Sequence, residues 1–195
     1  MKTVAFAVLL LLFSNSAALY AESGISQFQP FPSEPEDKFT IGVPLGWNSR
    51  ITPSSRGKLY AFWDGTGNAL TINVGIPNSF EQMLNSIAEN TISKAQLSEM
   101  QRVFRKEAPL KLDMKLSINT IANKKAFTQS YIYRHETLGA IGFLRHVGHD
   151  FLHGGKQYSI SYSSPPASTR EAAVATFETS LQRYFKPMLI SFFLR

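Results

Sequence analysis

The sequence predicts an α+β fold in which an antiparallel β-sheet is flanked by helices on both faces. Three observations predict this class. Strand-like segments separated by turn residues follow one another over residues 114–163, which is typical of an antiparallel meander. Helical periodicity appears in separate blocks, after Asn78 and near the C-terminus, and does not alternate with the strands. Several predicted strands carry apolar side chains at both odd and even positions, for example Tyr131, Ile132 and Tyr133. This pattern is expected when both faces of a sheet are covered.

The N-terminus predicts a secretory signal peptide over residues 1–21. Lys2 supplies a positive charge, residues 4–13 form an unbroken apolar run, and small residues follow in the stretch SNSAALYA. A helix of this run spans about 15 Å, roughly half of a bilayer core, so a permanent anchor is not expected. We expect cleavage after Ala18 or Ala21, and export to the periplasm or secretion of the mature protein. A buried N-terminal strand is the alternative.

The composition restricts the available chemistry. The chain has 195 residues, no cysteine and a formal net charge of +6. Thiol nucleophiles, cysteine zinc sites, disulfides and a lipid-modified cysteine are therefore excluded. Hydrophobic residues make up 44% of the chain and charged residues 17%, which predicts a packed core. No later apolar run approaches the roughly 18 residues of a membrane span, so the mature protein is expected to lack a transmembrane segment.

The remaining chain is predicted to be a linker followed by a single domain. Residues 22–37 contain three prolines, four acidic residues and no sustained periodicity, which predicts a Pro-rich linker or arm. A single α+β domain is predicted over residues 38–195. Strands are expected at 39–43, 58–64, 68–76, 114–122, 126–135, 140–152 and 156–163.

Two helices are expected in this domain. The first starts at Asn78, where Asn78 and Glu81 resemble a capping box, and fades near Lys94. Residues 95–110 are compatible with short helical or extended segments. The second helix starts at the capping box of Ser168 and Glu171. Pro187 is expected to stop that helix, and the last seven residues, LISFFLR, to form a strand or extended tail.

Three of the four histidines, His146, His149 and His153, fall within eight positions and are the candidate metal ligands. If the strands pair across the double glycine that follows, His153 faces Lys156 and His149 faces Ile160. His149 and His153 then share one face, while His146 lies on the other. His149 and His153 are about 13 Å apart along the strand, whereas zinc bonds are about 2.1 Å long. We interpret all three as strand residues and expect no metal or other cofactor, unless the strand bends.

The sequence contains no recognisable catalytic signature. It has no G-x-S-x-G elbow, no H-E-x-x-H motif and no phosphate-binding glycine loop. No two of its 14 acidic residues recur at a spacing that indicates an acid–base pair. His149 and Asp150 cannot form a dyad, because neighbouring strand side chains point to opposite faces. We therefore assign no catalytic residue and do not expect an enzyme.

Positive charge is concentrated in residues 94–134, which hold nine Lys or Arg and three Asp or Glu. Such a region can steer an acidic protein or an anionic surface toward the molecule. The charges are spread singly through the segment, so an ordinary solvated face is the alternative interpretation. Because export is expected, nucleic acid is not expected as a partner.

The predicted elements follow one another in a definite order. The stretch FTIGVPLGW, with Pro44, Gly46 and Trp47, is followed by a hairpin, a helix, a meander, GGKQYSISYSS, a long helix and a final Ser191-Phe192. This order of motifs resembles that of the PsbP-like/DcrB-like family. The resemblance covers about residues 38–193. It implies a PsbP-like α/β/α sandwich, a fold shared with the Mog proteins, and a binding or assembly role. The chain lacks the cysteine of the lipoprotein members, so tethering to a membrane is not implied.

These observations predict an exported, non-enzymatic binding or assembly domain that acts on an envelope protein or an anionic surface. The alternative is a small hydrolase or metal-dependent enzyme whose site the sequence does not display.

Overall fold

The computed structural model describes residues 27–78, 80–107, 110–137 and 140–195. The predicted signal peptide lies outside the described residues. The chain divides into two compact units, which are described separately. Of the described residues, 27–46 and Leu181–Arg195 form the small unit, and those of Trp47–Ser180 form the large unit.

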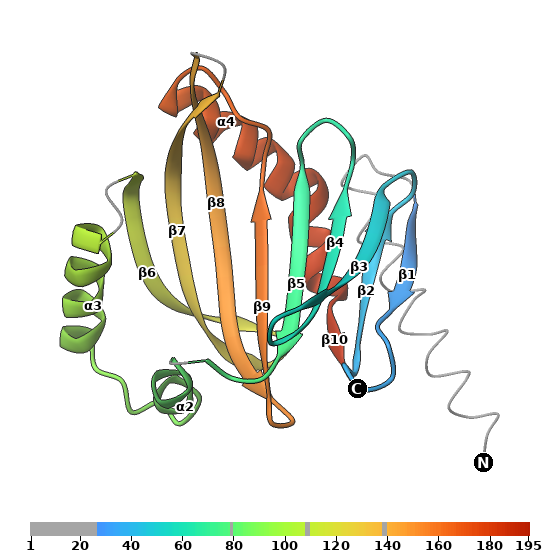
Figure 1. Cartoon of the computed structure of the whole chain (residues 1–195), viewed down its shortest axis with the longest axis vertical. Coiled ribbons are helices and arrows are strands. Elements are labelled where there is room, and N and C mark those ends of the chain that lie inside the picture. The colour runs from blue at the N-terminus through green and yellow to red at the C-terminus, as the bar shows by residue number, and fades with distance from the viewer. Residues whose placement is uncertain (1–26, 79, 108–109, 138–139) are drawn as a thin grey trace. The chain divides into compact units, whose positions relative to one another are not determined.

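The large unit contains a seven-stranded antiparallel sheet with the strand order β3-β4-β5-β9-β8-β7-β6 (Figure 1). An α+β class with a large antiparallel sheet is therefore confirmed. The edge strand β3 was not expected from the sequence. The strands are β3 (Asn48–Ser54), β4 (Gly57–Trp63), β5 (Ala69–Gly75), β6 (Lys111–Ile121), β7 (Lys124–Thr137), β8 (Ala140–His153) and β9 (Lys156–Ser163).

The hairpin between β8 and β9 has the register that the double glycine predicts. Gly154 and Gly155 have φ angles of +57° and +74°, a backbone conformation that glycine adopts without steric cost. His153 faces Lys156 and His149 faces Ile160 across the hairpin. The predicted pairing of the histidine-containing strand is confirmed.

Three helices belong to the large unit: α2 (Glu81–Ala88), α3 (Lys94–Glu107) and α4 (Arg170–Ser180). The prediction of one helix reaching Lys94 was wrong, because α2 ends at Ala88 and α3 starts at Lys94. A capping box opens α3: Ser93 N–H donates to Gln96 Oε1 at 2.7 Å, and Gln96 N–H donates to Ser93 Oγ at 3.2 Å.

The starts of α2 and α4 also differ in detail from the expected capping boxes. Asn78 Oδ1 accepts a hydrogen bond from Phe80 N–H at 2.8 Å, two residues along the chain, so it forms a local turn ahead of α2. At α4 the cap is Thr169, not Ser168, because Thr169 Oγ1 accepts from Ala172 N–H at 3.1 Å.

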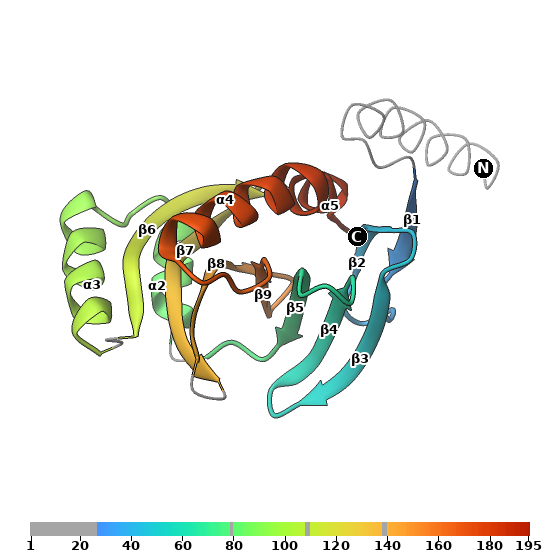
Figure 2. The ribbon, with the colours of Figure 1, turned by 90° about the horizontal axis from the view of Figure 1, so that it is seen from above.

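The helices pack on the sheet of the large unit through aromatic and aliphatic side chains. Leu84 and Ile87 of α2 form a buried cluster with Phe127 of β7, and Phe104 of α3 lies 6.4 Å from Phe127 between ring centroids. On α4, Phe177 stacks on Tyr162 of β9 at 5.7 Å. Burial of each such side chain contributes about 1.5–3 kcal/mol. Figure 2 shows α3 beside β6 and α4 along the sheet of this unit.

The small unit contains a three-stranded antiparallel sheet with the order β1-β2-β10. Its strands are β1 (Phe28–Pro32), β2 (Phe39–Pro44) and β10 (Phe193–Leu194). The predicted linker 22–37 thus contains an edge strand, a position in which prolines are tolerated. The buried side chains of this unit include Phe39, Ile41, Phe185, Met188 and Phe192.

The C-terminal helical region does not stop at Pro187 as expected. A π-helical turn, η1 (Leu181–Phe185), leads into α5 (Lys186–Ser191), and only Phe193–Leu194 is extended. Pro187 stands at the start of α5, where a backbone N–H is not needed for the helix. Within the described ranges, no helix is long and apolar enough to cross a membrane.

The final Ser191-Phe192 joins helix α5 to strand β2 within the small unit. Gly42 N–H donates to Ser191 Oγ at 2.7 Å, and Ser191 Oγ donates to Met188 O at 2.7 Å. The ring of Phe192 lies 5.4 Å from that of Phe39. These two residues therefore have a structural role.

Candidate functional site

His149 lies in a buried chain of polar side chains in the large unit. Its Nδ1 is 2.8 Å from Thr128 Oγ1, and its Nε2 is 3.2 Å from the Tyr162 hydroxyl. Burial, with a smaller contribution from the charge of His146, lowers the pKa of His149 to about 4. The imidazole is thus neutral at neutral pH. Either tautomer is satisfied, because each hydroxyl can donate or accept.

The burial and the raised pKa of Tyr162 do not suit a catalytic group. Burial, together with the nearby charge of Glu178, raises the pKa of the Tyr162 hydroxyl well above its usual range. Its side chain is 6% exposed and stacked against Phe177. The Thr128–His149–Tyr162 chain is inaccessible to a substrate, and its contacts are those of a satisfied polar group in the core.

The other two candidate histidines, His146 and His153, lie outside the Thr128–His149–Tyr162 hydrogen-bonded chain. The ring of His146 stacks on Tyr131 at 4.9 Å, and Lys111 Nζ lies 4.4 Å from the centre of the same tyrosine ring. Burial and, to a lesser extent, Lys111 lower the pKa of His146 to about 4. His153 lies beside Tyr158, with ring centroids 6.2 Å apart.

The three candidate histidines do not all lie on one face of the sheet. His146 pairs with Ser163 and His149 with Ile160, three residues apart on β9, so the two imidazoles point to opposite faces of the sheet. In the part of the chain that the structure describes, no three His, Asp or Glu side chains come together as metal ligands.

The carboxyl group of Asp150 on β8 is half-buried and accepts two hydrogen bonds that the sequence did not predict. Ser159 Oγ donates to Asp150 Oδ1 at 2.5 Å, and Gln157 Nε2 donates to the same oxygen at 3.1 Å. Burial raises the pKa of Asp150, and the two hydrogen bonds oppose that rise. Gln157 Oε1 in turn accepts from Asn78 N–H at 3.1 Å, so this network connects the sheet to the segment before α2.

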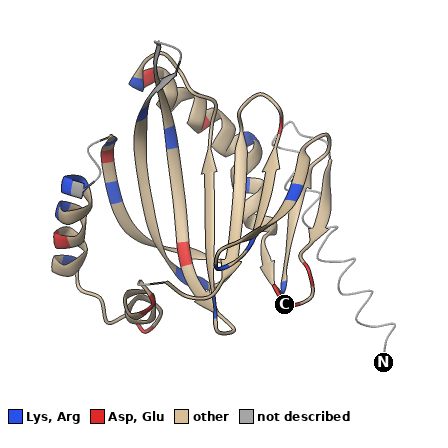
Figure 3. Cartoon of the chain, in the orientation of Figure 1, with Lys and Arg blue, Asp and Glu red and all other residues tan. Residues whose placement is uncertain are grey.

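The nine basic side chains of residues 94–134 lie on three neighbouring elements, α3, β6 and β7, and are together called the basic surface. They lie around the edge of the sheet, because the register places Lys115, Lys124 and Arg134 on the face of Ile132, and Lys111 and Lys125 on the other face. Lys111 and Lys124 are half-buried, and the other seven are exposed. Figure 3 shows Lys and Arg positions along α3 and on β6. The members are Lys94, Arg102, Arg105, Lys106, Lys111, Lys115, Lys124, Lys125 and Arg134.

Among the described ion pairs, Glu99 offsets one cation of this surface. Glu99 holds Arg102 at 2.6 Å on α3, and this hydrogen bond lowers the pKa of the Glu99 carboxyl. The ion pair of Asp113, at 3.9 Å, is with Arg170 of α4, which is not a member of the basic surface. Positive charge therefore predominates over the surface as a whole.

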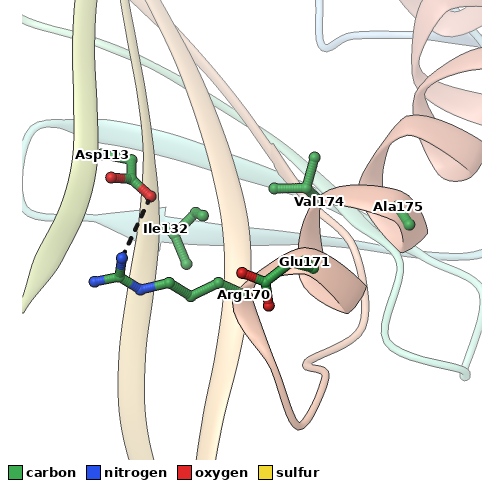
Figure 4. A pocket seen from close by; sticks show the side chains of 6 residues that line it. All are labelled: Asp113, Ile132, Arg170, Glu171, Val174 and Ala175. Atoms are coloured by element: carbon green, nitrogen blue, oxygen red, sulfur yellow. Dashed lines mark ion pairs between the residues drawn. The ribbon is translucent and has the colours of Figure 1, made fainter.

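An open cavity of about 410 Å³ lies in the large unit between β6, β7 and the first turns of α4 (Figure 4). Ile132, Val174 and Ala175 supply its apolar lining. Asp113, Arg170 and Glu171 supply charged groups of both signs. None of these residues was a candidate in the sequence, because the cavity brings together segments about 60 residues apart.

No protein-family model matches the chain, and no curated protein matches it. Several solved structures are similar in fold. One is a Bacteroides thetaiotaomicron protein with 13% identity and a TM-score of 0.45; the alignment covers 87% of this chain and 49% of that one. This chain therefore spans about half the length of that protein.

Two further structures are similar over most of both chains. The Saccharomyces cerevisiae Ran-binding protein Mog1p has 12% identity and a TM-score of 0.45, with 86% of this chain and 96% of that one covered. LpqN of Mycobacterium tuberculosis, involved in cell envelope biogenesis, has 11% identity and a TM-score of 0.37, covering 86% and 90%. At TM-scores below 0.5, these similarities assign neither a family nor a function.

Proposed function

We propose that this chain is an exported, non-enzymatic binding domain that recognises an acidic protein partner or an anionic surface of the cell envelope. The observation that carries the proposal is the basic surface on α3, β6 and β7, where seven of nine cationic side chains are exposed. Exposed cations attract acidic partners over distances up to the Debye length, about 8–10 Å at physiological salt. The enzyme alternative receives no support from the Thr128–His149–Tyr162 chain, because that chain is buried.

The proposal includes the domain organisation expected from the sequence. Residues 1–21 are a signal peptide, residues 22–37 precede the domain, and residues 38–195 form one PsbP-like α+β domain. Helices flank the large sheet on both faces: α2 and α3 pack near Phe127, and α4 packs on Tyr162. In support, Phe127 pairs with Asp150 and Tyr162 with Val147, so their side chains belong to opposite faces.

Export is tested by N-terminal sequencing of the protein purified from the envelope fraction of its host. A mature chain starting near Leu19 or Glu22 supports the proposal. An intact chain starting at Met1 and found in the cytoplasm contradicts it.

Binding is tested with defined anionic probes and charge-reversed variants of the mature protein. The probes are vesicles with and without phosphatidylglycerol, and an acidic polyglutamate peptide. We expect Lys106→Glu with Lys115→Glu to weaken binding strongly. Arg50→Glu with Arg56→Glu makes the same change in net charge at exposed positions of β3 and the β3–β4 turn, and should weaken binding much less.

The two probes distinguish the two classes of partner. Binding to phosphatidylglycerol vesicles identifies an anionic surface, and binding to the peptide alone identifies an acidic protein. In both cases binding should weaken as salt is raised. Equal losses in the two charge-reversed pairs would show that only net charge matters, and would contradict the proposed surface.

A further inference from the structure

The cavity between β6, β7 and α4 contains partners for two opposite charges above an apolar floor. We infer that it binds a small zwitterion with an apolar side chain, of the class of a free α-amino acid. This inference does not depend on the proposed function, because none of the cavity-lining residues belongs to the basic surface.

The apolar part of the cavity suits an aliphatic or aromatic side chain. Ile132 is 2% exposed and belongs to the packed sheet, so it closes the bottom of the cavity. Val174 and Ala175 of α4 supply the accessible apolar contacts. The cavity has a volume of about 410 Å³ and is open to solvent, so part of a bound ligand stays exposed.

The charged part suits a carboxylate and an ammonium group together. The Arg170 guanidinium presents several N–H donors and can hold a carboxylate through two parallel hydrogen bonds. Asp113 and Glu171 are acceptors for an ammonium group. The carboxylates of Asp113 and Glu171 would repel a ligand that carries only a carboxylate. A ligand that carries only an ammonium group would not provide a carboxylate to pair with Arg170.

The existing ion pair leaves room for such a ligand. Arg170 Nη1 and Asp113 Oδ2 are 3.9 Å apart, at the limit of an ion pair, and the two side chains are 46% and 57% exposed. Exposed pairs of this kind contribute little to stability, so separating the two groups to admit a ligand costs little.

The position of Asp113 depends on a bulge that α3 supports. The pairing of β6 with β7 shifts between Leu112 and Lys115, and Asp113 has a φ angle of +51°, which is uncommon outside glycine. The next carbonyl, Met114 O, accepts from Gln101 Nε2 and Arg105 Nη2 of α3, each at 3.0 Å. These two hydrogen bonds hold the bulge that carries Asp113.

The test is calorimetric titration of the mature protein with L-leucine and L-phenylalanine. We expect saturable binding of at least one of them. N-acetyl-leucine lacks the ammonium group and leucinamide lacks the carboxylate, so each should bind about tenfold more weakly or worse. Glycine, which has no side chain to fill the apolar part, should show the same loss.

Three variants locate the site. Arg170→Gln should weaken amino-acid binding about tenfold or more, and also remove the preference for leucine over leucinamide. Asp113→Asn should remove the preference over N-acetyl-leucine. Arg50→Gln makes the same change in charge at an exposed position of β3 outside the cavity and should leave binding unchanged, and thermal melts verify that each variant is folded.

Three results would each overturn the inference. The first is the absence of saturable binding of both amino acids to the folded wild-type protein. The second is equal affinity for leucine and leucinamide, and the third is binding that persists unchanged in folded Arg170→Gln, because each of these would show that the cavity does not recognise the zwitterion.

Discussion

Nε2 of His149 lies 3.2 Å from the hydroxyl oxygen of Tyr162, both residues are buried, and the ring of Tyr162 stacks on Phe177 of α4. The second ring nitrogen is bonded to Thr128. Both polar atoms of the imidazole thus have hydroxyl partners, so the buried histidine is satisfied while it stays neutral. Protonation of this imidazole is therefore expected to lower the stability of the folded state.

Acidification should destabilise the protein between about pH 6.5 and pH 4. The pKa of His149 is about 4 in the folded protein and near its ordinary 6.5 when unfolded. Within this window the unfolded state binds more protons, so stability is fully present above pH 6.5 and falls as pH falls. The loss from His149 is at most about 3 kcal/mol. His146 acts in the same direction, and Asp150, whose pKa is raised, acts in the opposite one.

Urea unfolding followed as a function of pH measures this effect, and His149→Gln isolates it. The glutamine amide does not titrate, so the variant should lose less stability than the wild type between pH 6.5 and pH 4. Equal losses in the two proteins would show that His149 is not the group responsible.

Removing the hydroxyl of Tyr162 should destabilise the protein by about 1–2 kcal/mol. Tyr162→Phe leaves one ring nitrogen of His149 without its partner in a buried site, and an unsatisfied buried polar atom carries a desolvation penalty. Urea unfolding at pH 7.5 measures the change. Tyr133→Phe, at a half-buried position of β7, is the matched control and should change stability by less than about 0.5 kcal/mol. Similar losses in both variants would contradict the structural role of the polar chain.

Local sequence signals predicted most of the large sheet, because its register is determined by short-range chemistry. Two glycines form the turn between β8 and β9. Because strand side chains alternate, the side chains of His146 and His149 then point to opposite faces of the sheet. The periodicity of residues 95–110 does not distinguish a helix from extended segments, although a local signal for α3 is present. Ser93 and Gln96 have the spacing of a capping box, and the apolar stripe that follows is helical.

The cavity and the C-terminal helices depend on contacts that the sequence alone does not display. Asp113 reaches the cavity only because a bulge interrupts β6, and that bulge is held by side chains of α3. Pro187 was expected to end a helix, yet a π-helical turn precedes it and the proline starts α5 instead. In both cases tertiary packing overrides a correct local rule.

The contact between Gly42 and Ser191 predicts a non-additive pair of substitutions. Ser191→Ala removes the acceptor of Gly42 N–H and should cost about 1–2 kcal/mol. In Gly42→Ala the new methyl group would lie 2.9 Å from Ser191 Oγ, so we expect a loss of about 1–3 kcal/mol. The double variant lacks that oxygen, and its loss should be smaller than the sum of the single losses by at least about 0.5 kcal/mol. Additive losses in urea unfolding would exclude the contact.

Zinc should not bind tightly to the histidine-containing strand. Coordination by His149 would require one ring nitrogen to give up Thr128 or Tyr162 inside the core, and His146 points to the opposite face of the sheet. Zinc also needs three or four ligands at about 2.1 Å, which side chains on the two faces of one strand do not provide. Calorimetric titration with zinc should therefore show no stoichiometric high-affinity site, and His149→Ala should titrate like the wild type. Tight binding of one zinc ion that disappears in His149→Ala would instead establish a metal site at this strand.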